Sequence, residues 1–230
     1  MKHFFGKVFE ALLITISFPV VLILLFLFGL LPDKANNVVI VGTKRSGKTT
    51  LWKDLGGIKT VKPNTSTDRI ESFVVTRKNG TKVTVSETYD MGGENEYVAS
   101  YGSIIDKDDT FIYYLVDSNE VKDPSKMTRI RSDLLKIDKI VKEKGFEKIG
   151  FKFILTHFYD YVEKNPGSSE YDLYRQFSKG LEKSKGRGVI GSRLSDANYN
   201  RIMMVAELDE KKAKKLGKDY IDIIKNEIGG

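Results

Sequence analysis

The sequence predicts an α/β fold: a doubly wound, mostly parallel sheet of about six strands with helices on both faces, preceded by one membrane-spanning helix. Two patterns support this prediction. Short apolar runs alternate with segments whose apolar residues recur at helical spacing, as in connected β-α units. Before them lies an apolar stretch, residues 11–31, without a charged side chain. At 230 residues, the chain has room for one globular domain beside this stretch, and not for a second.

Residues 11–31 consist largely of Leu, Ile, Val and Phe. A helix of this length, at about 1.5 Å per residue, crosses roughly 30 Å of hydrocarbon. A cleaved signal peptide is the competing interpretation, but the run is too long and no small-x-small cleavage site follows it. We therefore expect a short tail at 1–10, a transmembrane signal-anchor helix in the lipid bilayer at 11–32, and a globular domain at 33–230.

The charge distribution indicates the partner and the compartment. The net charge of +7 is spread along the chain and interleaved with Asp and Glu, which favours an anionic membrane surface over nucleic acid. Lys and Arg are more numerous just after the predicted span than before it, which favours a cytoplasmic globular domain. The absence of cysteine excludes disulfides, thiolate metal sites and palmitoylation.

The stretch VVIVGTKRSGKTT at 38–50 joins an apolar strand to a glycine-containing loop. Gly42, four further residues, then Gly47, Lys48 and Thr49 fit the phosphate-loop pattern G-x-x-x-x-G-K-[ST]. Such glycines let main-chain N–H groups turn inward around a β-phosphate, the lysine reaches the β- and γ-oxygens, and the threonine hydroxyl binds Mg²⁺. The sequence therefore predicts a nucleoside triphosphate site formed by Gly42, Lys44, Arg45, Ser46, Gly47, Lys48, Thr49 and Thr50.

The elements that follow this loop begin with a helix and a hairpin. The helix is expected to turn its apolar residues toward the core: Leu51, Trp52 and Leu55. Two β-rich runs, 70–77 and 82–89, then flank Asn79-Gly80, which is typical of a hairpin with a type I′ turn. The second run leads into Asp90-Met91-Gly92-Gly93. An acidic residue at this strand tip holds Mg²⁺, often through water, and a glycine N–H meets the γ-phosphate, which predicts roles for Asp90 and Gly93.

The second half of the chain continues the alternation. Apolar runs at 110–116 and 151–155 predict buried strands of a mostly parallel sheet. Helical spacing predicts a helix between them with a buried face formed by Ile130, Leu134, Ile137 and Val141. A helix at 170–183, a strand at 202–206 and a closing helix complete the domain. The residues of the closing helix expected to face inward are Leu216, Tyr220, Ile223 and Ile224.

Three segments resemble the Arf-like branch of the small GTPases. They are GTKRSGKTT at 42–50, YDMGGE at 89–94 and YLVDSN at 114–119. The resemblance extends over about 38–228 and implies a P-loop NTPase fold, with a small GTPase domain at 33–230. A membrane helix joined closely to such a domain is similar to the beta subunits of signal recognition particle receptors.

The resemblance implies further site residues. In this family a threonine of the first switch loop completes the Mg²⁺ shell, and Thr65 occupies that place, with Thr67 as the alternative. Where the family has a glutamine that orients the attacking water, this chain has Glu94. A carboxylate cannot donate a hydrogen bond to the developing γ-phosphate charge, and it repels that charge. We therefore expect slow hydrolysis that needs a partner, with Lys48, Gly93 and Glu94 as the catalytic residues.

Base recognition departs from the family pattern. The family recognises guanine with Asn-Lys-x-Asp, whereas this chain has THFYD at 156–160. Counting back from Asp160 puts His157 at the asparagine and Phe158 at the lysine, while one inserted residue puts Thr156 and His157 there instead. Asp160 then accepts from guanine N1 and N2 or caps the next helix, and Phe158 stacks on the base. The family's Ser-Ala-Lys loop is matched by its alanine alone. The predicted base contacts are His157, Phe158, Asp160 and Ala206.

Together these features predict a membrane-anchored GTP-binding switch that uses GTP and Mg²⁺. It would recruit a soluble or peripheral protein partner through its switch surface, with protein targeting as the expected process and no direct contact with nucleic acid. We expect a single-pass protein with its domain in the cytoplasm, at the endoplasmic reticulum if eukaryotic and otherwise at the plasma membrane. The alternatives are a constitutively nucleotide-bound scaffold and an ATP-using membrane component.

Overall fold

The computed structural model describes residues 37–56, 69–85, 88–89, 101–147, 149–182 and 202–228, which belong to the unit that spans residues 35–230. Within these described segments, no helix has both the length and the apolar character needed to span a bilayer. The predicted tail at 1–10 and membrane helix at 11–32 lie outside them, so both stay predictions.

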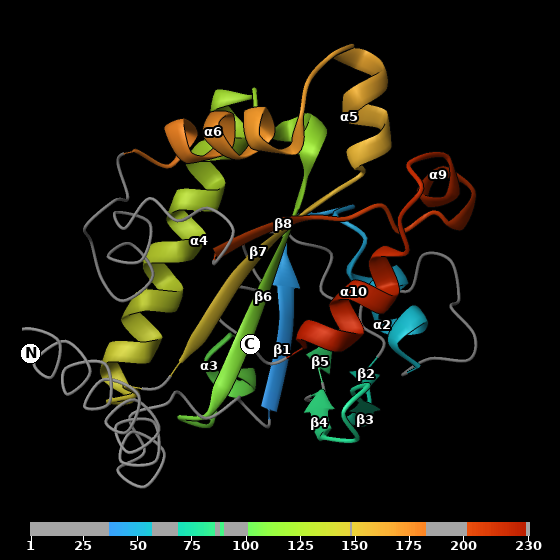
Figure 1. The fold of residues 1–230 in the computed structure, drawn as a ribbon. Coiled ribbons are helices and arrows are strands. Elements are labelled where there is room, and N and C mark those ends of the chain that lie inside the picture. Colours follow the sequence, from blue (N-terminus) through green and yellow to red (C-terminus); the bar gives the residue numbers. More distant parts are fainter. Residues whose placement is uncertain are drawn as a thin grey trace, which may run out of the picture. The chain divides into compact units, whose positions relative to one another are not determined.

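The described unit is built on a six-stranded sheet with the order β3-β4-β1-β6-β7-β8 (Figure 1). The neighbouring pairs from β4 to β8 are parallel, and the edge pair β3–β4 is antiparallel. This confirms the prediction of a mostly parallel sheet. The strands are β1 Asn37–Gly42, β3 Phe73–Thr76, β4 Lys82–Val85, β6 Thr110–Asp117, β7 Gly150–Thr156 and β8 Met203–Val205.

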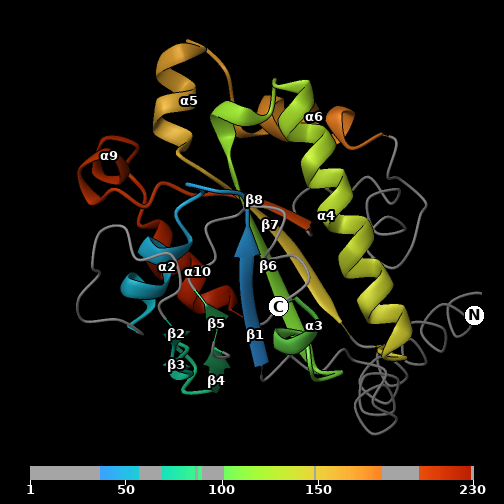
Figure 2. The same ribbon diagram turned by 180° about the vertical axis from the view of Figure 1, so that it is seen from behind.

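Helices cover both faces of this sheet, as the doubly wound prediction requires (Figures 1 and 2). In both views α2 (Lys48–Leu55) and α10 (Tyr220–Glu227) lie side by side on one face. On the other face lie α4 (Pro124–Glu143) and α6 (Glu170–Gly180). The remaining helical segments are α3 Tyr101–Ile104, η2 Ser118–Glu120, α5 Phe158–Lys164 and α9 Glu210–Lys215.

Burial explains why these segments form these elements. Every residue of β1 is buried, because a central strand of a parallel sheet is covered by helices on both sides. The predicted inward faces of the first two helices are confirmed: the buried apolar residues include Leu51, Trp52 and Leu55 of α2 and Ile130, Leu134, Ile137 and Val141 of α4. The carboxyl ends of β1, β6, β7 and β8 lie at one edge of the sheet, where the loops that follow them can form a shared site.

The hairpin is present, but its turn differs from the predicted type I′. Strands β2 (Arg69–Ile70) and β5 (Thr88–Tyr89) pair in the same register as β3 and β4, so the two pairs form one interrupted hairpin. A type I′ turn requires positive φ at both central residues, yet in the described part of this turn only Gly80 has positive φ, at 79°. The Gly80 N–H donates to the Arg77 carbonyl at 2.9 Å, which makes a three-residue loop with glycine in the left-handed position.

The closing helix was predicted too long. It is split into α9 and α10, because the chain turns at Gly217, where φ is 67°. Tyr220 and Ile224 are buried as expected, whereas Ile223 is 36% exposed and its inward prediction is wrong. Leu216 ends α9 and is partly buried against the core. Similarly, α6 ends at Gly180, three residues before the predicted limit of the helix at 170–183.

A buried carboxylate lies between α4 and the sheet. Asp133 is 3% exposed, and one of its carboxylate oxygens accepts a hydrogen bond from the Tyr114 hydroxyl at 2.8 Å. Burial raises the pKa of Asp133 above its usual 3.8, and the Tyr114 hydrogen bond and nearby Arg129 oppose this shift. The folded state therefore holds the proton of Asp133 to a higher pH than the unfolded state does.

This difference makes stability depend on pH. A carboxyl whose folded pKa is raised loses stabilising effect as pH rises from its unfolded pKa through its folded pKa. We expect Asp133→Asn, which keeps a Tyr114 acceptor without a titrating charge, to gain stability relative to wild type as pH rises from 3.8 to neutrality. Urea unfolding across this pH range measures the difference, with the exposed Asp109→Asn as control for the change from carboxyl to amide. A pH-independent difference for Asp133→Asn would contradict the prediction.

Candidate nucleotide site

The loop that follows β1 is fixed against the neighbouring strand. A Cβ atom on Gly42, whose φ is 143°, would lie 2.1 Å from the main-chain oxygen of Leu115 in β6. The next residue, Thr43, donates its N–H to the same Leu115 carbonyl at 3.0 Å. Because only glycine permits this approach, the first position of the phosphate-loop pattern sets where the loop leaves the sheet.

The loop closes around the side chain of Lys48. This lysine is only 7% exposed, and its Nζ donates to the carbonyls of Gly42 at 3.3 Å and Thr43 at 2.7 Å. The main chain between them turns through left-handed conformations, with φ of 60° at Arg45 and 85° at Gly47. The ammonium is therefore held inside the loop, where its charge can meet a phosphate.

Helix α2 begins immediately after this loop, and its start differs from those of α4, α6, α9 and α10. Its N-cap is Gly47, no side chain caps it, and its first turn has no acidic residue. In contrast, α4, α6, α9 and α10 each begin at a side chain that accepts from their first turn: Asp123, Ser169, Asp209 and Asp219. The first N–H groups and the positive end of the α2 dipole are thus presented to the loop, an arrangement that suits an anion.

A cavity of about 580 Å³ opens beside the start of α2. This volume is within the range of small-molecule sites. The lining comes from α2, from the end of β7 and from the segment after β8, and includes the predicted residues Gly47, Thr49, Thr50 and His157. The other lining residues are Lys53, Asp54, Glu207, Leu208, Asp209, Glu210 and Lys212. Lys44 and Arg45 are exposed on the loop, whereas Ser46 is buried and its hydroxyl donates to the Thr43 carbonyl at 2.8 Å.

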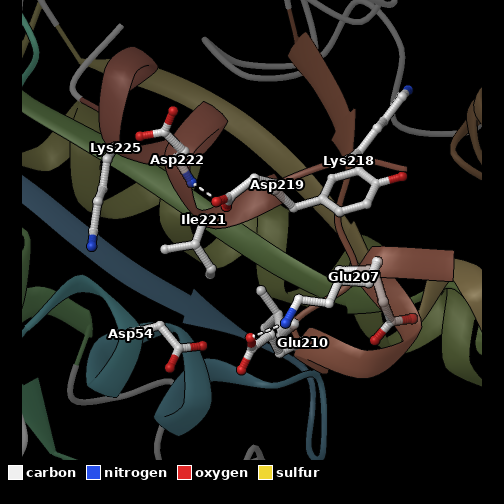
Figure 3. Close-up of a pocket in the computed structure, with 12 residues that line it drawn as sticks. Asp54, Glu207, Glu210, Lys218, Asp219, Ile221, Asp222 and Lys225 are labelled. Atoms are coloured by element: carbon white, nitrogen blue, oxygen red, sulfur yellow. Dashed lines mark hydrogen bonds and ion pairs between the residues drawn. The ribbon is translucent and has the colours of Figure 1, made fainter. Parts of the chain in front are cut away.

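A second cavity of about 430 Å³ adjoins the first and is drawn in Figure 3. Both are lined by Asp54, Glu207, Leu208 and Glu210. Figure 3 shows Asp54 projecting from α2 on one side, and Glu207 and Glu210 coming from the segment after β8 on the other. Burial raises the pKa of Asp54, with Lys53 opposing the shift. Acidic groups therefore line the wall that the two cavities share.

The end of β7 is tied to the phosphate loop by two hydrogen bonds. The Thr156 hydroxyl donates to the Ser46 carbonyl at 2.9 Å. The Nε2 atom of His157 lies 3.1 Å from the Arg45 carbonyl oxygen. His157 has a φ of 56° and forms the N-cap of α5, so the chain bends sharply at this point. The structure thus brings the predicted base segment against the predicted phosphate loop.

Two residues of the 156–160 segment do not lie where direct contact with a base would place them. Phe158 is buried, with its ring stacked on Tyr161 at a centroid distance of 6.3 Å, and it does not line the cavity. Asp160 is the third residue of α5, whose N-cap is His157, so the helix-cap alternative for Asp160 is wrong. Its Oδ1 instead accepts from Lys212 Nζ at 2.6 Å. Stacking of Phe158 on a base would require its ring to leave the core.

The segment after β8 supplies Ala206 and two residues that the sequence did not single out. The Ala206 N–H donates to the Leu155 carbonyl at 2.9 Å, and its own carbonyl accepts from the Phe158 N–H at 3.4 Å. Glu207 is only 2% exposed, and its carboxylate oxygens accept from the N–H groups of Tyr159 and Asp209, both at 3.1 Å. Glu207 and Lys212 are 48 and 52 positions from their partners in α5, and no local pattern indicates such pairs.

Four predicted site residues lie outside the described segments: Thr65, Asp90, Gly93 and Glu94. Of the predicted Mg²⁺ ligands, Thr49 is described, and it is half-buried in the lining of the larger cavity. Its hydroxyl is a hard oxygen donor of the kind that Mg²⁺ prefers. The described residues therefore fit the phosphate and metal end of a nucleotide in chemistry and in location.

No protein-family model matches the chain, and no curated protein matches it significantly. Among solved structures it is similar to the Arl6 (BBS3) small GTPase from Trypanosoma brucei with a bound nucleotide analogue, at 15% identity and a TM-score of 0.46, over 82% of this chain and 96% of that one. It is also similar to a GTP-binding protein from Sulfolobus solfataricus in complex with GDP, at 16% identity and a TM-score of 0.46, over 84% of this chain and 50% of that one.

A third likeness is to the bacterial selenocysteine-specific elongation factor EF-Sec, at 17% identity and a TM-score of 0.45, over 83% of this chain and 28% of that one. The chain thus spans half or less of the length of the latter two proteins. Likenesses of this size assign neither a ligand nor a partner to the chain, and its function rests on the geometry of its own site.

Proposed function

We propose that this chain is a membrane-anchored GTP-binding protein that binds GTP with Mg²⁺ through residues 42–50. The observation that carries the proposal is the closed loop around Lys48, whose Nζ donates to the Gly42 and Thr43 carbonyls directly before a helix with no side-chain cap. Anchoring at 11–32 is supported by the uncharged apolar stretch in the sequence.

Each described residue has a distinct task in this proposal. Main-chain N–H groups of the loop and of the first turn of α2 bind the phosphates, and Lys48 neutralises the β- and γ-oxygens. The Thr49 hydroxyl holds Mg²⁺, together with Thr65 and Asp90 by resemblance to the Arf-like family. A Mg²⁺ ion held by these residues would reduce the negative charge of the phosphates.

Guanine is the proposed base. Its support is the resemblance to the family, together with the placement of the 156–160 segment against the phosphate loop by the Thr156 and His157 contacts. Asp160 lies in the first turn of α5 and Ala206 directly follows β8, so both come after the carboxyl ends of adjacent parallel strands at the same sheet edge. Ala206 is held there by its hydrogen bond to Leu155.

We further propose that GTP and GDP switch a surface that includes the neighbourhood of Thr65 and Gly93, and that this surface recruits a soluble or peripheral protein in protein targeting. The motivation is the succession of a membrane segment, a phosphate loop and an Asp-x-Gly-Gly segment in one chain. Hydrolysis is proposed to be slow because Glu94 replaces the water-orienting glutamine. Glu94 also favours a second candidate, a constitutive scaffold that keeps its nucleotide.

The first prediction from this proposal concerns GTP binding. We expect Lys48→Ala to weaken Mg²⁺-dependent GTP binding by about a hundredfold, because the proposed charged hydrogen bonds from Lys48 to the β- and γ-phosphate oxygens are lost, each contributing on the order of 1.5 kcal/mol or more. Calorimetry measures the affinity, and Lys107→Ala, which removes an exposed lysine outside the proposed site, is the control. Thermal unfolding checks that the variant folds, and membrane insertion is expected to persist. Full GTP affinity in folded Lys48→Ala would remove the phosphate-loop assignment.

The second prediction concerns hydrolysis. We expect Glu94→Gln to raise the rate of GTP hydrolysis, because an amide can donate to the developing charge where a carboxylate repels it. Single-turnover release of phosphate from preloaded protein gives this rate, and binding affinity for GTP should stay unchanged. An unchanged rate would show that another group positions the water.

The third prediction separates the switch from the scaffold. Full-length protein loaded with a non-hydrolysable GTP analogue should recover a partner from the cytosolic fraction, and GDP-loaded protein should recover less of it. Quantitative comparison of the two pull-downs decides the matter, with the nucleotide-free Lys48→Ala variant as background. Equal recovery in the two nucleotide states would favour the constitutive scaffold.

A further inference from the structure

The carboxylate proposed to recognise the base is already engaged by a lysine. Lys212 Nζ lies 2.6 Å from Asp160 Oδ1, and the two side chains are 35% and 29% exposed, so the pair is partly shielded from solvent. The hydrogen bond with Asp160 raises the pKa of Lys212, with the charges of Glu207 and Asp209 adding to it. At neutral pH the pair is therefore an ammonium bound to a carboxylate.

The position of Lys212 is set by the fold around it. It lies in α9, whose N-cap Asp209 accepts from the Lys212 N–H at 3.0 Å. The buried carboxylate of Glu207 accepts hydrogen bonds from the N–H groups of both Asp209 and Tyr159, and so joins the start of α9 to α5. A second lysine of α9, Lys215, donates to the Tyr159 hydroxyl at 3.2 Å. These contacts hold α9 against the first turn of α5 and keep Lys212 beside Asp160.

Lys212 also stands between Asp160 and the cavity. The residues that line the 580 Å³ cavity include Lys212 together with Gly47 and Thr49 of the phosphate end, and they do not include Asp160. A nucleotide bound in this cavity therefore meets a wall to which Lys212 contributes and Asp160 does not.

The ammonium changes what this site can distinguish. A carboxylate is an acceptor only, so it favours the N1–H and N2–H donors of guanine and disfavours the N1 acceptor of adenine. An ammonium beside the carboxylate adds a donor. The carboxylate of the pair then accepts from guanine N1–H while the ammonium donates to O6, and equally the carboxylate accepts from adenine N6–H while the ammonium donates to N1. The chemical basis for rejecting adenine is thereby weakened.

We propose that Lys212 is a specificity-determining residue of the base site, which occupies Asp160 and makes the site accept both purine nucleoside triphosphates with little discrimination. This inference rests on the proposed function, because it assigns Asp160 to the base. Because Lys212 lies in α9 and not in the loop at 42–50 to which phosphate binding is assigned, we expect its removal to change the choice of base and to leave phosphate binding intact.

The test compares the Mg²⁺-dependent affinities of the full-length protein for GTP and ATP by calorimetry. In wild type, we expect the two dissociation constants to agree within about tenfold. In Lys212→Met the GTP preference should rise by about tenfold or more, because guanine donors no longer compete with an ammonium for the carboxylate. Lys212→Arg should keep the wild-type ratio, since it retains a cationic donor.

The matched control is Lys215→Met, which removes a lysine from the same helix whose partner is the Tyr159 hydroxyl and which does not line the cavity. Its GTP-to-ATP ratio should equal that of wild type, whereas a general loosening of α9 would shift it. If Lys212→Met fails to fold, the same measurement is made on Lys212→Gln, which also removes the ammonium, and its GTP-to-ATP affinity ratio is compared with that of wild type.

Two results overturn this inference alone: an unchanged ratio in folded Lys212→Met that still binds GTP, or a wild-type preference for GTP of about a hundredfold or more. If wild type binds neither triphosphate in the presence of Mg²⁺, the proposed function fails and this inference with it. The two failures are thus distinguished by the wild-type measurement.

Discussion

The main chain of Gly42 lies so close to the Leu115 carbonyl of the adjacent strand that no side chain fits between them. This contact fixes the exit of the loop from the sheet, and the Thr43 hydrogen bond to the same carbonyl extends it by one residue. The carbonyls of Gly42 and Thr43 are then placed to accept from Lys48. The position of the ammonium inside the loop, and hence the proposed phosphate site, depends on this approach of two strands.

The other loops at the same sheet edge are attached to the phosphate loop and to one another by main-chain carbonyls. Thr156 and His157 contact the carbonyls of Ser46 and Arg45, and Ala206 is bonded to the end of β7. Because the acceptors are main-chain carbonyls, these links do not restrict the side chains at 45 and 46, whereas they require donor side chains at Thr156 and His157.

Charge at the far end of the cavity is organised differently from charge at the phosphate end. The buried ammonium of Lys48 donates to two carbonyls of the loop directly before α2. Asp160 and Glu207, in contrast, are satisfied by an ammonium and by two N–H groups. The phosphate end thus places a buried ammonium beside an uncapped helix start, which suits an anion, whereas these two carboxylates at the base end already have partners.

The sequence alone determined the alternation of strands and helices, the phosphate loop and the inward faces of α2 and α4, since these depend on local periodicity and on a short motif with a fixed spacing. It placed the hairpin but not its turn type, because Asn79-Gly80 is compatible with more than one loop length. It did not foresee the break at Gly217 or the exposure of Ile223, which follow from how α10 packs on the sheet. Only the tertiary structure decided that Phe158 lies in the core and that Lys212 meets Asp160. Contacts between residues about fifty positions apart depend on the packing of α9 against α5, which no local pattern encodes.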